Sequence, residues 1–244
     1  MSALLPKYSN LRCKICDGET SVIGVKDFNR TCEEEKGRVV FAPMGFPIYY
    51  HQCNECGFIF TIDLDSWSKQ DFLVNIYNDE YIKVDPDYDT KRAMDCIQWF
   101  EPLLGGDKSI SILDYGAGTD TFSQKLADKG YDAVGWDPMW LTDPAFDQNK
   151  KFDVITAFEV LEHTPNPWET MDEIMSFVNP DDGQIIISTL VSDIIRDDII
   201  DYWYLAPRNG HVCMHSVKSL TYMFNKVGME IQHFSPSQHV ASWK

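Results

Sequence analysis

Four cysteines in the N-terminal quarter of the chain have the spacing of a metal site. They form two Cys-x-x-Cys turns, each followed within two positions by a glycine: Cys13, Cys16, Cys53 and Cys56. Four thiolates from two such turns can surround a zinc ion in a closed tetrahedron, which leaves the ion no open position for catalysis. We therefore predict a structural Zn2+ site, whose binding energy stabilises a segment too short for a large core.

The two turns are separated by residues 17–52, a longer interval than the about 15–20 residues that are typical of such pairs. We interpret the extra length as an inserted hairpin or loop that contains residues 30–47. Two alternatives remain open for the four cysteines: a redox-active pair, or structural thiols without a ligand. The other cysteines, Cys32, Cys96 and Cys213, lack this spacing, and we expect Cys96 and Cys213 to be buried thiols.

A second group of residues has the chemistry of a small-molecule site. The apolar residues 110–113 lead into Asp114. Gly116 and Gly118 follow, before a helical pattern begins at Thr121. Glycines at this spacing allow a sharp turn, and the unpaired amides that open a helix attract an anionic group. The pattern predicts a cradle for a small molecule; a turn that serves only strand-to-helix packing is the alternative.

Asp137 ends the next predicted strand, about 20 residues after the glycine turn, where a carboxylate can accept hydrogen bonds from ribose hydroxyls. The turn lacks the third glycine that dinucleotide packing requires, because Thr121 stands in its place. Asp114 would repel a pyrophosphate but would attract an ammonium group. S-adenosylmethionine carries an ammonium, a sulfonium and a ribose, so the two aspartates favour it over a dinucleotide.

The elements that must position these residues alternate from residue 109 onward. Four apolar runs predict strands and three amphipathic stretches predict helices: 110–114, 133–136, 152–158 and 184–190 for the strands, and 121–129, 167–178 and 216–227 for the helices. This order predicts a mainly parallel sheet with helices on both faces, closed by an antiparallel hairpin at 229–234 and 238–243. Upstream, residues 66–107 show helical spacing that is broken at 85–87, which predicts two helices.

Three stretches of the sequence, in this order, resemble the class I S-adenosylmethionine-dependent methyltransferases: residues 112–118, 134–137 and 152–163. The resemblance extends over residues 75–244 and implies an α/β, Rossmann-like fold with methyl transfer as the activity and S-adenosylmethionine as the cofactor. It also implies how the cofactor is held: the methionine part by Asp114, Tyr115, Gly116, Ala117, Gly118, Phe158 and Glu159, the ribose by Asp137, and the adenine near Pro138 and Met139.

Two departures from the family pattern concern the cofactor. Asp120 stands where family members usually carry glycine, so the start of the helix is bulkier and more acidic. The segment between Asp137 and residue 152 is short, so we expect the family's third strand and its adenine-contacting acid to be abbreviated or missing. Asp143 and Asp147 are the remaining candidates for that acid.

The cysteine segment resembles the N-terminal modules of sugar C-methyltransferases, and residues 201–212 resemble a loop of relatives that methylate sugars and other small polar metabolites. The resemblance implies a small polar substrate, such as a sugar or nucleotide sugar. We expect the methyl group to be transferred to an oxygen or nitrogen atom of that substrate. Oxygen acceptors need a base, and histidine titrates near neutral pH. We predict three catalytic residues: His211 as the base, His163 as the second candidate for the base, and Tyr202 as a residue that binds the substrate. Loop anchoring, helix capping and lid packing are the respective structural alternatives.

The chain has 244 residues and a formal net charge of -17, which opposes binding to nucleic acid and to anionic membranes. Residues 1–10 lack the apolar core of a signal peptide, and no stretch has the ~20 apolar residues of a membrane span. We therefore expect a cytoplasmic protein with a zinc-ribbon-like module (1–65), a helical connector or lid (66–107) and a methyltransferase core (108–244). A scaffold that retains the fold, or a protein or RNA methyltransferase, are the alternative functions.

Overall fold

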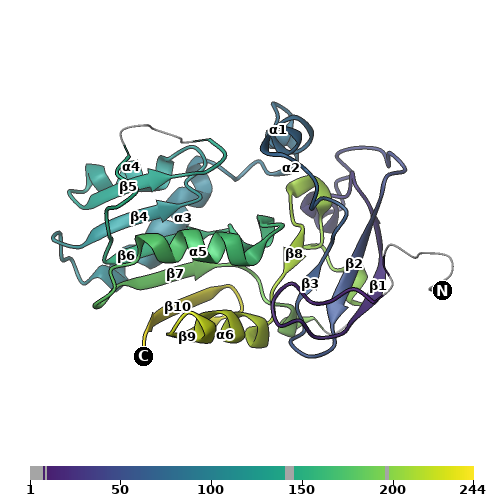
Figure 1. Ribbon diagram of the computed structural model, residues 1–244. Helices are drawn as coiled ribbons and strands as arrows, with labels where there is room; N and C mark the ends of the chain where they lie inside the picture. The colour runs from purple at the N-terminus through teal and green to yellow at the C-terminus, as the bar shows by residue number, and fades with distance from the viewer. Residues whose placement is uncertain (1–7, 9, 141–145, 196–197) are drawn as a thin grey trace.

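Two β-sheets form the framework of the protein, and the computed structural model describes residue 8 and residues 10–140, 146–195 and 198–244. A four-stranded sheet has the strand order β1-β2-β3-β8, and a six-stranded sheet has the order β5-β4-β6-β7-β10-β9. Figure 1 shows the larger sheet on the left and the smaller sheet on the right, with β8 on the side of the smaller sheet that faces the larger one.

The smaller sheet is built on an antiparallel hairpin of β1 (Thr20–Asp27) and β2 (Pro47–Cys53). The connection between these strands contains the 3₁₀ helix η2 (Cys32–Lys36). This connection spans nearly all of the predicted insertion, residues 30–47. β3 (Ile59–Phe60) pairs with β2 on one side and with β8 (Cys213–Met214) on the other. A strand from far along the sequence therefore completes the N-terminal sheet, and the three-part division of the chain remains a prediction.

Three α-helices and a 3₁₀ helix, rather than the two predicted helices, occupy the connector: α1 (Lys69–Asn75), α2 (Tyr81–Val84), α3 (Thr90–Phe100) and η3 (Glu101–Leu104). The predicted break at residues 85–87 separates α2 from α3. The additional break lies near Asn78, whose Oδ1 accepts a hydrogen bond from the Glu80 amide at 3.0 Å and so favours a turn.

Among the described residues, no helix combines the length and the apolar character of a membrane-crossing segment.

The larger sheet has four parallel strands and an antiparallel C-terminal pair: β4 (Ser111–Tyr115), β5 (Asp132–Trp136), β6 (Val154–Phe158), β7 (Gln184–Ser188), β9 (Met229–Ser235) and β10 (Gln238–Trp243). The helices that alternate with them are α4 (Thr121–Asp128), α5 (Pro167–Phe177) and α6 (Val217–Lys226). The predicted Rossmann-like α/β sheet with an antiparallel C-terminal hairpin is confirmed. β5 lies at the edge of the sheet, so no described strand takes the place of the family's third strand. Asp143, a candidate for the adenine-contacting acid, lies outside the described residues.

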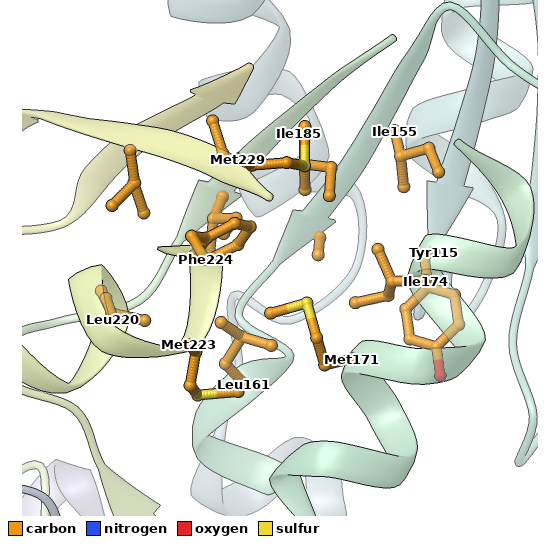
Figure 2. Packing of buried hydrophobic residues seen from close by; sticks show 14 of the residues in the cluster. Tyr115, Ile155, Leu161, Met171, Ile174, Ile185, Leu220, Met223, Phe224 and Met229 are labelled. Carbon is orange, nitrogen blue, oxygen red and sulfur yellow. The ribbon is translucent and has the colours of Figure 1, made fainter. Parts of the chain in front are cut away.

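The main hydrophobic core lies between the larger sheet and helices α5 and α6. Figure 2 shows Met171 and Ile174 of α5 and Phe224 of α6 near Ile155 of β6 and Ile185 of β7. Each of these five side chains is at most 1% exposed. Because complete burial of one such side chain contributes about 1.5–3 kcal/mol, this layer is a main source of stability for the larger sheet.

The two sheets share this core. Cys13, Cys53, Phe58 and Phe60 of the N-terminal segment belong to the same cluster of buried side chains as the residues of α5 and α6. Phe58 and Phe60 stack with their ring centroids 5.5 Å apart. Disruption of the smaller sheet would therefore expose apolar surface that the larger sheet also uses.

Candidate functional site

The four predicted zinc ligands converge on one point beside the smaller sheet. The sulfur atoms of Cys13, Cys16, Cys53 and Cys56 all lie within 4.8 Å of one another, and none forms a disulfide. The Sγ–Sγ distance is 3.6 Å from Cys13 to Cys56 and 3.5 Å from Cys16 to Cys53. These separations are close to the ~3.8 Å between sulfurs of a tetrahedral zinc site. The spacing of the cysteines in the sequence therefore corresponds to a compact four-sulfur cluster in space.

A cavity of about 850 Å³ opens at the carboxyl ends of β4, β5 and β6. All ten residues predicted to contact the cofactor line this cavity: residues 114–118, 137–139 and 158–159. The carboxyl edge of parallel strands is the usual ligand-binding edge of an open α/β sheet. The fold thus brings three separate stretches of sequence to one site.

Asp137 holds the turn after β5 against the turn after β4. Its Oδ2 accepts a hydrogen bond from the Gly118 amide at 2.9 Å, and its Oδ1 accepts from the amides of Met139 at 2.7 Å and Trp140 at 3.0 Å. Burial raises the pKa of Asp137, although these amides favour its charged form. A carboxylate oxygen accepts about two hydrogen bonds, so Oδ2 retains a position for a ligand donor.

Asp114 at the end of β4 is only 5% exposed. Burial raises the pKa of Asp114 to about 7, and the charges of Asp120 and Asp137 add to the shift. The Thr156 hydroxyl donates to Oδ1 of Asp114 at 2.8 Å, which favours the charged form. A cationic group bound next to Asp114 would complete the stabilisation of the carboxylate.

The glycine turn after β4 is tied to β5 by its own amides. The amides of Gly116 and Ala117 both donate to the carbonyl of Trp136, at 2.8 and 3.2 Å. Gly116 has a φ of 77°, and a Cβ at this position would lie 2.5 Å from Cγ2 of Val160, so glycine is required for both conformation and space. The amides of Gly116 and Ala117 are therefore already bonded, and the predicted cradle for an anionic group at the start of α4 remains a prediction.

Asp120, the departure from the family pattern, is not among the described residues that line the cavity. Its φ of 63° is a left-handed conformation that glycine adopts freely and other residues adopt rarely. Its carboxylate accepts hydrogen bonds from Gln124 Nε2 at 3.0 Å and from the Ser123 hydroxyl. It also lies against β5, where a Cβ at Gly135 would collide with it. Asp120 therefore lies where it can act on Asp114 through its charge and not by lining the cavity.

Of the three predicted catalytic residues, His163 is the one that lines the described part of the cavity. Its Nδ1 lies 3.0 Å from the hydroxyl of Tyr77, which also lines the cavity. Burial lowers the pKa of His163 well below its usual value, and the neighbouring His211 lowers it further. The imidazole of His163 is therefore neutral at pH 7, and one of its ring nitrogens carries a lone pair.

His211 and Tyr202 are not among the described lining residues. His211 is 6% exposed, and its ring centroid lies 4.8 Å from that of His163. Its Nδ1 donates to the Tyr204 carbonyl at 2.7 Å, and burial lowers the pKa of His211 to about 4. Tyr202 packs against Trp203. These contacts agree with the structural alternatives of anchoring and packing, and the catalytic roles remain predictions.

Helix α3 supplies cavity residues that the sequence analysis did not identify. Four residues on one helical face, at positions i, i+3, i+4 and i+7, line the cavity: Asp89, Arg92, Ala93 and Cys96. Asp89 accepts hydrogen bonds from the hydroxyls of Thr119 and Thr121, each at 2.7 Å, and so ties α3 to the start of α4. The sequence analysis used the spacing of apolar residues, and it therefore missed a helical face made of charged and small residues.

The connector adds aromatic side chains to the cavity: Trp67, Phe72, Tyr77, Tyr81 and Tyr88. The rings of Tyr77 and Tyr81 meet edge to face at 5.2 Å, and Trp140 meets Tyr77 at 6.3 Å. Aromatic surfaces with polar groups at their edges suit a ligand that has both a ring face and hydroxyls.

Two glutamates lie at the inner end of this site. Glu159 lines the cavity, and its Oε1 accepts a hydrogen bond from the Ser188 hydroxyl at 2.9 Å. Glu162 is fully buried; its Oε1 accepts from the Tyr204 hydroxyl, whereas its Oε2 has no hydrogen-bond partner among the described residues. Burial raises the pKa of Glu162 to about 8, and the charge of Glu159 adds to this shift.

Comparison with curated proteins finds relatives over about half of the chain. The ubiquinone biosynthesis O-methyltransferase of Bordetella avium (strain 197N) is 25% identical over 150 residues, which cover 50% of this chain and 62% of the relative. Its namesake in Acinetobacter baumannii (strain AYE) is 22% identical over 154 residues, which cover 53% and 64%. The chain thus spans less than two thirds of the length of these relatives.

Comparison with solved structures finds methyltransferases at low sequence identity. A 1,6-didemethyltoxoflavin-N1-methyltransferase from Burkholderia thailandensis has a TM-score of 0.49 and 15% identity, over 71% of this chain and 85% of its own. A magnesium protoporphyrin IX methyltransferase from Synechocystis PCC 6803 has a TM-score of 0.45 and 16% identity, over 75% and 97%.

A family model described as a methyltransferase domain matches residues 88–233. The match begins just before α3 and ends within β9, so it contains the four parallel strands and the turns that line the cavity. Because this match covers more than half of the chain, the protein belongs to the methyltransferase-domain family.

Proposed function

We propose that this protein transfers a methyl group from S-adenosylmethionine to an oxygen or nitrogen atom of a small polar molecule. The observation that carries the proposal is that all ten residues of the predicted cofactor set line one cavity, in a chain of the methyltransferase-domain family. At about 850 Å³ the cavity falls in the range of pockets that hold a cofactor and a small ligand.

The residues present fit the chemistry of this cofactor. Asp114 is a buried carboxylate without a cationic partner among its described hydrogen bonds, and it would pair with the ammonium group. Asp137 Oδ2 retains an acceptor position for a ribose hydroxyl, and Met139 and Phe158 offer apolar surface. The cofactor supplies an electrophilic methyl group on a sulfonium sulfur. The protein contributes alignment of the reacting groups and exclusion of water.

We place the acceptor molecule beside the aromatic residues Tyr77, Tyr81 and Trp140, next to His163. Activation of the acceptor occurs at His163, which borders the cavity, and His211 behind it is a positioning residue. A sugar or nucleotide sugar is the substrate class we propose, since the rings and hydroxyls of this surface suit a cyclic, polyhydroxylated molecule.

We also propose that the four-cysteine cluster holds a structural Zn2+ ion. Four sulfur atoms within 4.8 Å fit a closed thiolate site, and the Ile15 amide at 3.4 Å from Cys13 Sγ would stabilise the negative charge of a thiolate. A closed site of this kind contributes to folding and leaves the chemistry to the cavity.

Calorimetry with S-adenosylmethionine tests the cofactor assignment directly. We expect saturable binding of one molecule per chain, and transfer of a labelled methyl group to members of a nucleotide-sugar panel. Absence of binding at millimolar cofactor would contradict the proposal and favour a scaffold that retains the fold. Binding with transfer only to RNA or to a basic peptide would keep the activity but reject the small-molecule substrate.

A further inference from the structure

A group of three metal-binding side chains lies at the inner end of the cavity, separate from the cysteine cluster. One carboxylate oxygen of Glu162 and one ring nitrogen each of His163 and His211 lie within 4.8 Å of one another. Glu162 and His211 are buried, whereas His163 borders the cavity. The group therefore connects the protein interior with the space in which we place the acceptor.

The hydrogen bonds of the two histidines leave ring nitrogens available. His211 Nδ1 lies 2.7 Å from the carbonyl of Tyr204, and a carbonyl can only accept, so Nδ1 carries the proton and Nε2 carries the lone pair. Metal-binding histidines commonly donate their second N–H to a backbone carbonyl in this way, which orients the ring. Tyr77 contacts Nδ1 of His163 at 3.0 Å, and its hydroxyl can serve the same purpose.

Glu162 supplies the second, independent observation. Its side chain is 0% exposed, yet Oε2 has no hydrogen-bond partner within the described chain. A buried carboxyl oxygen without a partner is costly in either protonation state, and a bound metal ion is one partner that can satisfy it. The nearby guanidinium of Arg92 is already bound to both oxygens of Asp85, at 2.8 and 2.9 Å. A cation at Glu162 would supply the missing partner.

We propose that Glu162, His163 and His211 bind a second divalent metal ion with an open coordination position toward the cavity. Two imidazoles and one carboxylate are a ligand set of zinc sites that retain a fourth, exchangeable position, and imidazole ligands favour Zn2+ over Mg2+ or Ca2+. An acceptor oxygen bound at that position would become more acidic and easier to methylate. This use of the ion rests on the proposed function, but the binding of the ion does not.

The metal content of the full-length protein tests the proposal. Protein stripped with a chelator is reloaded with Zn2+, freed of excess metal by gel filtration and assayed for zinc. We expect two ions per chain for the wild type, and one for Glu162→Gln and for His163→Ala. His233→Ala is the matched control, because it removes a histidine from β9, and it should retain two ions.

Reloading with Co2+ identifies which ion is lost. The absorption of a thiolate–cobalt complex should persist in Glu162→Gln and His163→Ala, while the weaker bands of a nitrogen and oxygen site disappear. A wild-type protein that binds only the thiolate-bound ion would overturn the proposal, as would two ions in both variants. Because wild-type stoichiometry decides the matter without a variant or a methylation assay, its failure is distinguishable from failure of the methyl-transfer proposal.

Discussion

The cysteine cluster and the cavity are both assembled at turns, but they bridge very different lengths of sequence. The sulfur cluster is complete within residues 13–56, and two short repeated turns supply all four sulfurs. The cavity draws on residues between 65 and 173, from the connector, from the turns after β4, β5 and β6, and from helices α4 and α5. A site formed by residues at short, regular spacing can be predicted from the sequence. A site formed by the packing of distant elements can be predicted only in part.

The two regions also differ in the charges that they bury. The cysteine cluster gathers four sulfurs, and backbone amides donate to two of them, those of Cys13 and Cys53. The cavity gathers carboxyl groups, and burial raises the pKa of Asp114, Asp137 and Glu159. The first region is therefore suited to a metal cation bound tightly for stability, and the second to cationic ligands that exchange.

Loss of one cysteine of the cluster is expected to have the largest effect on stability. Cys13→Ser is expected to abolish binding of the structural Zn2+, which contributes on the order of 10 kcal/mol to folding in comparable sites. Because the smaller sheet shares a core with the larger one, the thermal transition of the whole chain should fall as well. Zinc analysis and calorimetric unfolding measure both effects. Cys96→Ser, outside the cluster, should retain zinc. Equal loss of zinc from both variants would contradict the assignment of the ion to the four-cysteine cluster.

Removal of the Asp114 charge has the next largest expected effect. Asp114→Asn keeps an oxygen for the Thr156 hydroxyl but loses the attraction to an ammonium group, which we expect to weaken S-adenosylmethionine binding by about 10- to 100-fold. Titration calorimetry measures the change. Tyr202→Phe, which alters a residue that is not among the described lining residues, should leave the affinity unchanged. Unaltered affinity in Asp114→Asn would show that the cofactor is held elsewhere.

The smallest expected effect concerns pH. Asp114 has a pKa of about 7, so it takes up a proton below that pH and loses its attraction for the ammonium group. Cofactor affinity should therefore fall as the pH drops below about 7 and level off above it. Asp120→Asn removes a charge that raises the pKa of Asp114, so the midpoint should move to lower pH, by less than about one unit.

Asp128→Asn, an exposed substitution at the other end of α4, is the control for this shift and should not move the midpoint. Binding titrations over a range of pH give the midpoint for each protein. A midpoint that is the same in Asp120→Asn and wild type would show that Asp120 does not act on the cavity through its charge.

Local patterns in the sequence predicted the four-cysteine cluster, the Rossmann-like sheet and the three stretches that line the cavity. Each of these depends on residues close in sequence: the period of a strand, the φ of Gly116, or the turn between Cys13 and Cys16. Asp114 and Asp137 were predictable together because the carboxyl ends of neighbouring parallel strands meet at one edge of a sheet.

The tertiary structure was needed to show which of the remaining side chains reach the cavity. It placed His163 at the cavity and His211 behind it, and it brought Arg92 of α3 to the same site. It also turned Asp120 toward α4 and β5. It placed the buried Glu162 next to two histidines, with one carboxyl oxygen that no described residue binds. The physical reason is that these positions depend on how helices and loops far apart in sequence pack on the sheet, which no local periodicity encodes.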